Sequence, residues 1–391
     1  MQKERNELDE SSYGQRHPVC RSFGPRSSAT DILPAFAINR SKYLTVYNEE
    51  VSVMLTRVSA STRVIFTTVL LSVVSIGYST ASAGILLTPY AASAGFSLST
   101  FASGFANNGN HGPLGIGFNS NGGVLVSDYY GDVRLFPNVD GQNGSSVVPA
   151  ANYGTFRALG ITNSGGNLYL ATHVAHGVVQ ISSNGTFNQT IASGIDFARD
   201  IVVNPNNGHL FVSSHVGIWD VDPVNKTKTL ALSGSTDGLV ISGTTLYGSR
   251  DFNGPNASFN VIEGFNIGTW TKVFDSGRID TVDGLALGSG ALSGKIYGNT
   301  NDGKLWEISL SNPINNPNDN KLIASGGSRG DLIRVDTNGN SLLFTQTDSV
   351  LRLHAPSGGG FGVTAVPEPS SIAIFGIAGL GLFFRRRSAF K

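Results

Sequence analysis

The chain has 391 residues, of which 49 are Gly, 14% are charged and 40% are hydrophobic, and its formal net charge is zero. Low charge combined with abundant Gly, Asn, Ser and Thr is typical of an all-β extracellular protein and argues against a helical cytosolic one. Residues 84–365 contain 14 basic and 19 acidic side chains, hence a net charge of −5, which argues against a nucleic-acid partner.

The first segment with a clear pattern begins at Met54, where two arginines precede the apolar residues 64–76. Ala81-Ser82-Ala83 follows and has the small-x-small pattern of a cleavage site, with the cut before Gly84. This is the layout of a secretory signal peptide over 54–83, because the apolar run is too short for a typical membrane-spanning helix. The alternative is a buried helix of the fold.

The polar residues 1–53 precede this signal and show no periodicity, so we expect them to be unfolded. Either translation starts at Met54 and the upstream stretch is an extension called in error, which we favour, or the leader is unusually long. The single cysteine, Cys20, lies in this stretch. The region after the signal therefore holds neither a disulfide framework nor a cysteine metal site.

A second apolar run, residues 370–384, lies near the C-terminus. Pro367-Glu368-Pro369 precedes it, and Arg385-Arg386-Arg387 follows it. A helix of this length barely crosses a bilayer, and the arginines hold its end on the cytoplasmic side. Since the prolines prevent the helix from starting earlier, we expect a short transmembrane helix that holds the exported protein by its tail.

Residues 366–391 resemble the PEP-CTERM sorting signal of Gram-negative bacteria, because the tripeptide, the apolar segment and the arginines occur in that signal's order. The resemblance implies that exosortase, a membrane-embedded cysteine protease, cuts near the tripeptide. It further implies transient contact with exosortase and the inner membrane, arrival at the cell surface or extracellular matrix, and an association with exopolysaccharide. The alternative is a permanent tail anchor.

A sequence pattern of short apolar strands separated by turn residues recurs through the centre of the chain. In residues 198–234 four strands are expected, over Ile201–Val203, Leu210–Ser213, Gly217–Val221 and Thr229–Leu232. Similar patterns begin at six aligned residues, which we call anchors and which are spaced by 45, 40, 38, 46 and 47 residues. The anchors are Gly115, Gly160, Asp200, Gly238, Gly284 and Asp331. Four strands that repeat about every 40–50 residues indicate a β-propeller.

The six units predict an all-β fold, a six-bladed β-propeller of four-stranded antiparallel blades over residues 84–365, between a signal helix and the short transmembrane helix. A single blade exposes two apolar faces, which are buried when blades stack and the ring closes. Residues 84–99 are expected to supply strands that complete the last blade. A seven-bladed ring and a pair of β-sandwiches are the alternatives.

The phrases at 124–136, 210–222 and 296–309 resemble NHL-type propeller repeats and the senescence-marker/gluconolactonase superfamily. This resemblance is specific for a fold and says less about chemistry, since propellers host many functions. Gluconolactonase-like enzymes activate water with a central metal, whose ligands include a glutamate from the first blade. Residues 84–262 contain no glutamate, which weakens the enzyme interpretation.

Polar residues recur where the first strand of each unit starts and the second strand ends, and both positions face one mouth of the central channel. This candidate site for Ca²⁺, another divalent metal or a polar ligand comprises Asp128, His173, Asp200, His215, Asp237, Asp283 and Asp331, with Arg250 and Asn299 also on the ring. The simpler interpretation is that aspartates at strand starts form turn hydrogen bonds, which repeat because the turn repeats.

Two functions compete on this evidence. The first is a non-enzymatic binding or matrix module at the cell surface, sorted by its tail and linked to exopolysaccharide. The second is a divalent-metal-dependent hydrolase or lactonase of gluconolactonase-like type. A third interpretation, a structural adhesin, requires exposed aromatic stripes on the outer strands. The sequence contains no nucleophile elbow, phosphate loop or dinucleotide fingerprint in the propeller region, so it predicts no catalytic residue.

Overall fold

The computed structural model describes residues 84–155, 157–173, 177–251, 260–311 and 319–362. The expected signal helix with Ala81 and Ala83, and the C-terminal sorting signal with its expected helix, lie outside the described residues. Within the described ranges, every helix is too short or too polar to cross a bilayer.

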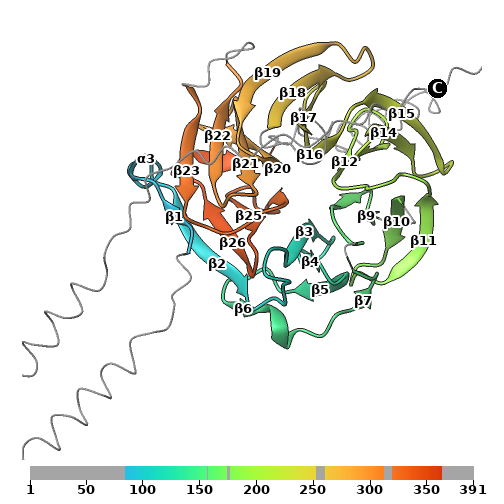
Figure 1. Cartoon of the computed structure of the whole chain (residues 1–391), viewed down its shortest axis with the longest axis horizontal. Coiled ribbons are helices and arrows are strands. Elements are labelled where there is room, and N and C mark those ends of the chain that lie inside the picture. The colour runs from blue at the N-terminus through green and yellow to red at the C-terminus, as the bar shows by residue number, and fades with distance from the viewer. Residues whose placement is uncertain (1–83, 156, 174–176, 252–259, 312–318, 363–391) are drawn as a thin grey trace, which may run out of the picture. The chain divides into compact units, whose positions relative to one another are not determined.

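The described residues form a six-bladed β-propeller, which confirms the predicted fold class (Figure 1). Blade 1 contains β3 (Pro113–Phe118), β4 (Val124–Asp128), β5 (Asp132–Phe136) and β7 (Ala151–Asn152); blade 2 contains β8 (Ile161–Ser164), β9 (Asn167–Thr172), β10 (Gly177–Ile181) and β11 (Phe187–Ala192). Blade 3 contains β12 (Ile201–Val203), β13 (Leu210–Ser213), β14 (Gly217–Asp222) and β15 (Thr227–Ser233). The four strands expected in 198–234 are therefore all present, with ends that differ by at most two residues.

The last three blades follow the same plan. Blade 4 contains β16 (Thr236–Ser242), β17 (Thr245–Asp251), β18 (Asn260–Asn266) and β19 (Lys272–Ile279). Blade 5 contains β20 (Val282–Gly290), β21 (Lys295–Thr300), β22 (Leu305–Ser309) and β23 (Lys321–Ser325), flanked by β1 (Leu86–Leu87) and β27 (Gly359–Phe361). Blade 6 contains β24 (Ile333–Val335), β25 (Ser341–Thr345), β26 (Ser349–His354) and β2 (Ser97–Ser103), with β6 (Gln142–Asn143) on its edge.

The ring closes because β2, from the start of the propeller, is the outer strand of the last blade (Figure 1). The short helix α3 (Pro89–Ser93) separates β1 from β2 and is capped by the Thr88 hydroxyl, which accepts a hydrogen bond from the Ala91 amide at 3.2 Å. Residues 84–99 were expected to complete this blade, but the closing strand starts only at Ser97. The earlier residues instead extend blade 5 through β1.

The core consists of six clusters of buried apolar side chains among the described residues, and each cluster lies between two neighbouring blades. Successive residues of a strand point to opposite faces, so each blade serves two clusters. Leu125 packs with Ile161 of blade 2, whereas its neighbour Val126 packs with Leu343 of blade 6. The ring thus buries both faces of every blade, as the prediction of a propeller required.

The anchor glycines mark the places where the inner strands of adjacent blades approach most closely. A Cβ atom on Gly115 would overlap the carbonyl oxygen of Leu159, and one on Gly238 would overlap that of Asp283. Only glycine leaves room for this approach, and it therefore recurs at the first strand of several blades. The residue just before such an anchor, for example Asp237 before Gly238, is then held at the mouth of the channel.

Candidate functional site

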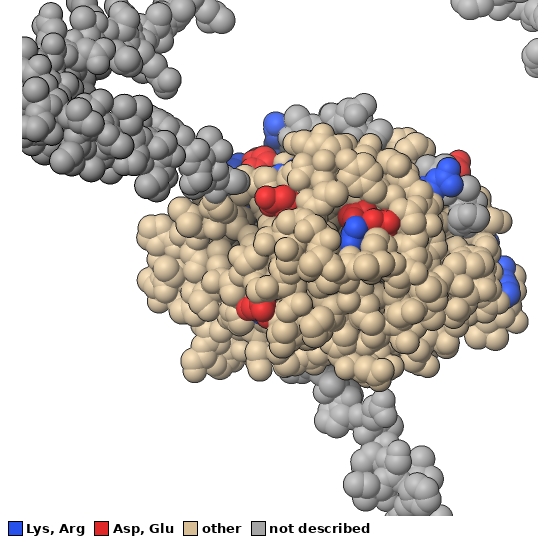
Figure 2. Space-filling model, turned by 90° about the horizontal axis from the view of Figure 1, so that it is seen from below, with Lys and Arg blue, Asp and Glu red and all other residues tan. Residues whose placement is uncertain are grey.

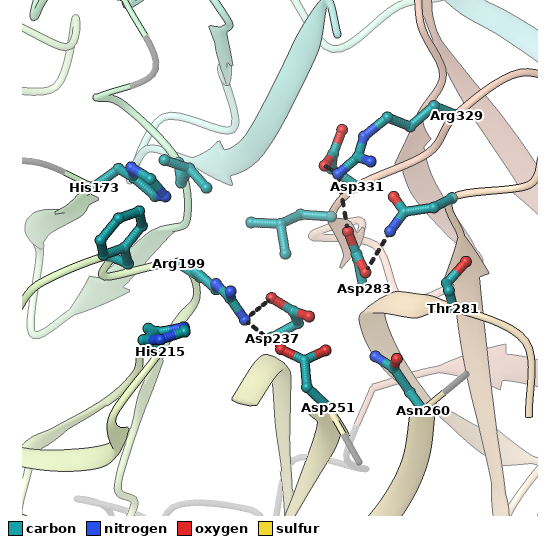
Figure 3. A pocket seen from close by; sticks show the side chains of 14 residues that line it. His173, Arg199, His215, Asp237, Asp251, Asn260, Thr281, Asp283, Arg329 and Asp331 are labelled. Atoms are coloured by element: carbon teal, nitrogen blue, oxygen red, sulfur yellow. Dashed lines mark hydrogen bonds and ion pairs between the residues drawn. The ribbon is translucent and has the colours of Figure 1, made fainter. Parts of the chain in front are cut away.

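A pocket of about 320 Å³ lies at the mouth of the channel where the first strands begin (Figure 3). One part of its wall consists of the anchor Asp331 and of four residues that directly precede an anchor, namely Leu159, Arg199, Asp237 and Asp283. Residues at or just beyond the ends of the second strands supply a further part, namely His173, His215, Asp251 and Asn301. Phe197, Asn260, Thr281, Arg329 and Leu332 complete the lining. The repeat of the blade therefore brings residues from five blades into one cavity.

One wall of the pocket is aromatic. The ring of Phe197 lies edge-on to His173, with centroids 4.4 Å apart, and its centroid is 5.6 Å from that of His215. Phe197 is 46% exposed and has a φ of 55°, in the left-handed region that non-glycine residues rarely adopt. An exposed aromatic ring in a strained backbone conformation at a cavity is typical of a functional position.

The opposite wall is polar, and Figure 3 shows Asp283, Arg329 and Asp331 across the pocket from His173 and His215. The Nη2 atom of Arg329 lies 3.0 Å from Asp331 and 3.4 Å from Asp283. Asn301 donates a hydrogen bond of 2.9 Å from its amide nitrogen to Asp283. The carboxylates on this wall therefore already have cationic and amide partners.

A second arginine neutralises the acidic groups in the middle of the pocket. Arg199 forms ion pairs with Asp237 and with Asp251, the latter at 3.0 Å. Its guanidinium is fixed further by the hydroxyl of Ser235 at 3.3 Å. Two arginines thus face four aspartates, and the protonation of these aspartates determines the remaining charge.

The pKa values of these groups shift strongly. Burial is the main reason that the pKa of Asp283 rises to about 7; Arg329 opposes this rise and Asp331 adds to it. Burial, and then repulsion from Asp283, also raises the pKa of Asp237 well above its ordinary value, although Arg199 opposes the rise. Burial, followed by the charge of Arg199, lowers the pKa of His173 to about 4, so its ring is neutral at pH 7. The pocket consequently holds far less charge than its composition suggests.

Five residues of the predicted mouth site line this pocket: His173, His215, Asp237, Asp283 and Asp331. The other two aspartates of the predicted set, Asp128 and Asp200, are both fully buried and do not line it.

Asp128 pairs with Arg134 and accepts hydrogen bonds from the backbone of Tyr130 at 3.0 Å and Asp132 at 3.1 Å. This is the turn bonding that the simpler interpretation expected. Arg250 and Asn299, also placed on the ring, lie outside the lining, where Arg250 faces Glu263 at 3.4 Å and Asn299 donates to the Thr345 carbonyl at 3.0 Å.

Asp200 pairs with Arg334, which belongs to blade 6 on the opposite side of the ring. One Asp200 oxygen also accepts the backbone amide of Leu239 at 2.9 Å. This ion pair therefore crosses the channel, and neither of its residues lines the pocket.

Sequence reasoning missed several lining residues. Arg199 precedes the anchor Asp200 as Asp237 precedes Gly238, so comparing the position before each anchor would have identified it. Phe197 and Arg329 come from connections between blades. Those connections do not repeat in length, and the sequence contains no periodic signal for them.

The pocket residues do not fit the divalent metal considered from the sequence. Among the described residues, no three His, Cys, Asp or Glu side chains gather in a group that would hold a metal ion. The pocket aspartates bind guanidinium groups, which occupy the oxygens that a calcium ion would need. The two glutamates of the described residues lie elsewhere, Glu263 beside Lys272 at 3.1 Å and Glu307 accepting from the Tyr297 hydroxyl at 2.8 Å.

Comparisons with known proteins bear on the tail and on the fold. Residues 365–387 match the family model of the PEP-CTERM protein-sorting motif. No curated protein matches this chain in sequence. The motif makes the chain an exported protein that exosortase processes at the membrane and that is sorted to the cell surface.

Solved propellers resemble the fold. A gluconolactonase from Xanthomonas campestris is 14% identical, with 70% of this chain and 95% of that chain covered and a TM-score of 0.50. The PQQ-bound aldose sugar dehydrogenase from Streptomyces coelicolor is 15% identical over 67% of this chain and 98% of that chain, with a TM-score of 0.50. A carbohydrate-active enzyme of family AA12 from Trichoderma reesei is 14% identical over 70% and 98%, with a TM-score of 0.51. At these identities the likeness concerns the fold alone.

Proposed function

We propose that this exported propeller is a non-enzymatic binding module of the cell surface, and that its mouth pocket binds a neutral saccharide unit of exopolysaccharide. The observation that carries the proposal is the pairing of an aromatic wall around Phe197 with a polar wall around Asp283. A sugar ring has an apolar face of C–H groups and an edge of hydroxyls. The first suits an aromatic ring, and the second suits carboxylate, amide and guanidinium groups.

The charge of the pocket favours a neutral ligand over an ionic one. Each carboxylate of the polar wall is already paired with Arg329, and Asp237 and Asp251 share Arg199. Groups fixed in this way still accept and donate hydrogen bonds to hydroxyls, but they offer little net charge to an ion. The volume of about 320 Å³ is at the small end of ligand pockets, which suits one or two sugar units.

The flank of the molecule seen in Figure 2 agrees with a matrix role. Figure 2 shows one side of the molecule on which Lys, Arg, Asp and Glu are sparse and most of the surface is formed by other residues. A surface with few charged groups approaches a hydrated polysaccharide without desolvating many charges.

Binding is tested with purified residues 84–365 and oligosaccharides cut from the host's own exopolysaccharide, measured by calorimetry. Arg329→Gln is expected to weaken binding about 10–100-fold, since hydrogen bonds to charged groups contribute about 1.5–3 kcal/mol. Lys272→Gln, on the outer strand β19, is the matched control and is expected to bind like the original protein. Absence of binding in the unmodified propeller would contradict the proposal. An equal loss of affinity in both variants would show that the saccharide does not bind in this pocket.

A hydrolase or lactonase, without the divalent metal considered from the sequence, is the second candidate because of one observation. A carboxyl with a pKa of about 7, such as Asp283, is suited to proton transfer near neutral pH. The pocket aspartates are paired with arginines and do not fit a metal, so catalysis would have to rely on the aspartate carboxyls themselves. Lactone hydrolysis assayed with and without added Ca²⁺ separates the two candidates. Turnover without Ca²⁺ would favour the enzyme, and turnover that requires Ca²⁺ would contradict the conclusion that the pocket does not fit a metal.

A further inference from the structure

Tyr129 of blade 1 occupies a position at the mouth that pocket residues occupy in other blades. Its backbone amide donates a hydrogen bond of 2.7 Å to the carbonyl oxygen of Gly112, three residues before the anchor Gly115. The pocket residues His173 and Asn301 make the same bond, at 3.2 and 2.9 Å, to the residues three positions before their own anchors. Because the blades are radial repeats, Tyr129 lies on the same rim of the channel as these two residues.

Tyr129 belongs to a cluster of three rings, which we call the aromatic shelf and which consists of His111, Tyr129 and Tyr130. The rings of His111 and Tyr129 are stacked, with centroids 5.4 Å apart and an angle of 22° between their planes. Tyr130 stands edge-on to Tyr129 at 5.4 Å, and its hydroxyl donates to the carbonyl oxygen of Asn107 at 3.2 Å. Tyr130 is 38% exposed and the other two rings are half-buried, so the shelf offers aromatic surface to a ligand at the mouth.

The shelf adjoins the polar wall of the pocket. The loop that carries His111 contacts blade 6, where the hydroxyl of Thr347 donates to the carbonyl oxygen of Asn110 at 3.2 Å. Arg329 and Asp331, which both line the pocket, are close enough for their charges to act on His111. Burial, followed by the charge of Arg329, lowers the pKa of the His111 ring, while Asp331 opposes this change. The shelf and the pocket are therefore neighbouring parts of one face.

We propose that the aromatic shelf is a second saccharide subsite, which holds sugar units of a bound exopolysaccharide chain that extend beyond the mouth pocket. This inference rests on the proposed function of the pocket. The pocket of about 320 Å³ suits one or two sugar units, so a longer chain has to continue over the rim. At the edge of the polar wall, the shelf supplies the aromatic rings against which the C–H face of a further sugar packs.

The loop beside the shelf suits an uncharged polysaccharide. Residues 104–112 contain no Asp, Glu, Lys or Arg. Asn107, Asn108 and Asn110 of this loop are exposed, and side-chain amides both donate hydrogen bonds to hydroxyls and accept them. The combination of aromatic rings with polar groups thus occurs twice at the mouth, once in the pocket and once at the shelf.

The dependence of affinity on chain length tests this subsite. Disaccharides and hexasaccharides cut from the host's own exopolysaccharide are titrated by calorimetry into the full-length chain, which is kept soluble by a detergent without a sugar headgroup. The ratio of hexasaccharide to disaccharide affinity is expected to fall about 3–10-fold in Tyr129→Ala, as the loss of an aromatic contact implies. Tyr129→Phe keeps the ring and is expected to keep the ratio. Phe187→Ala is the matched control, because it removes a ring that is 53% exposed on β11, the outer strand of blade 2.

The two proposals fail in different ways. If the unmodified chain binds neither oligosaccharide, the proposed function is wrong and the shelf proposal is wrong with it. If it binds both and the ratio is unchanged in Tyr129→Ala, or falls equally in Phe187→Ala, the shelf is not a subsite and the pocket proposal stands. Tyr130→Ser removes an exposed ring of the shelf and is expected to lower the ratio as well, so it decides the question if circular dichroism shows that Tyr129→Ala does not fold.

Discussion

Arg334 of β24 reaches across the central channel to Asp200 in the blade on the opposite side of the ring. Its Nη1 atom lies 3.3 Å from Asp200 Oδ2, and its Nε donates at 3.3 Å to the carbonyl oxygen of Ile161 in a third blade. Asp200 has no exposed side-chain surface and Arg334 has 14%, so the pair is shielded from solvent. One side chain therefore links blades 2, 3 and 6 across the channel.

Removing this tie is expected to destabilise the propeller. In Arg334→Ala the carboxylate of Asp200 remains buried without a cation, and breaking one partner of a buried pair costs about 3–5 kcal/mol. Urea unfolding of residues 84–365 measures the change. Lys272→Ala, which breaks a half-exposed surface pair with Asp275, is the control and is expected to cost no more than about 1 kcal/mol. Equal effects of the two variants would contradict the structural role of the Arg334–Asp200 pair.

Asp283 predicts an unusual pH dependence of stability. Its pKa in the folded protein is about 7, above the ordinary value of 3.8, so between these values the folded protein binds the proton more tightly than the unfolded chain does. The contribution of this carboxyl to stability is therefore lost as pH rises from about 4 to about 7. Asp283→Asn is expected to be more stable than the original at pH 8, by at most about 4 kcal/mol, and nearly equal at pH 4.

Urea midpoints of the two proteins at pH 4, 6 and 8 measure this difference. Asp302→Asn, at an exposed carboxyl two residues after Thr300, should show no comparable divergence with pH. If Asp283→Asn loses stability at pH 8, the carboxylate is stabilising as an ion, and the assignment of its raised pKa is wrong.

Substitution of Phe197 is expected to change ligand binding without a large change in stability. Its φ of 55° is strained for phenylalanine but free for glycine, so Phe197→Gly gains about 1 kcal/mol from the backbone and loses a partly exposed ring. We expect a free energy of unfolding within about 1 kcal/mol of the original. Saccharide binding should fall about tenfold, in keeping with the loss of an aromatic contact worth about 1.5 kcal/mol.

Lys226 offers a matched control because its φ is also 55° and its exposed side chain lies between β14 and β15, away from the pocket. Lys226→Gly is expected to make a similar backbone gain without any change in binding. Binding that is unaffected by Phe197→Gly would show that the aromatic wall does not contact the ligand.

Because the inner strands approach closely, we expect the propeller to lose stability when Gly238 is replaced by a larger residue. Gly238→Ala would place a methyl group against the Asp283 carbonyl, which is backbone and cannot rotate away, so we expect a loss of about 1–3 kcal/mol. Because this shift moves Asp283, binding should weaken as well. Ser242→Ala, at the other end of the same strand, is the control with a change within about 0.5 kcal/mol. Thermal unfolding of both variants checks the difference, and an unaltered Gly238→Ala would mean that the strands are further apart than described.

Much of the architecture followed from the order of residues alone. Short apolar strands and anchors such as Gly115 and Gly238 repeat at the spacing of a blade, because every blade must bury two faces and admit its neighbour at the channel. The sorting motif is likewise a local pattern, legible from a tripeptide, an apolar run and three arginines. Such features depend only on neighbours in the chain, so they are visible before any fold is known.

The composition of the site was decided by the tertiary structure. The repeat placed Asp237, Asp283 and Asp331 at one mouth, yet two other aspartates expected there, Asp128 and Asp200, are buried against arginines. Partners such as Arg334 arrive from a different blade, and Phe197 comes from a connection with no counterpart in the other units. A repeat specifies how deep in the channel a residue lies. The groups that face it across the channel depend on the closed ring, which brings together residues more than a hundred positions apart.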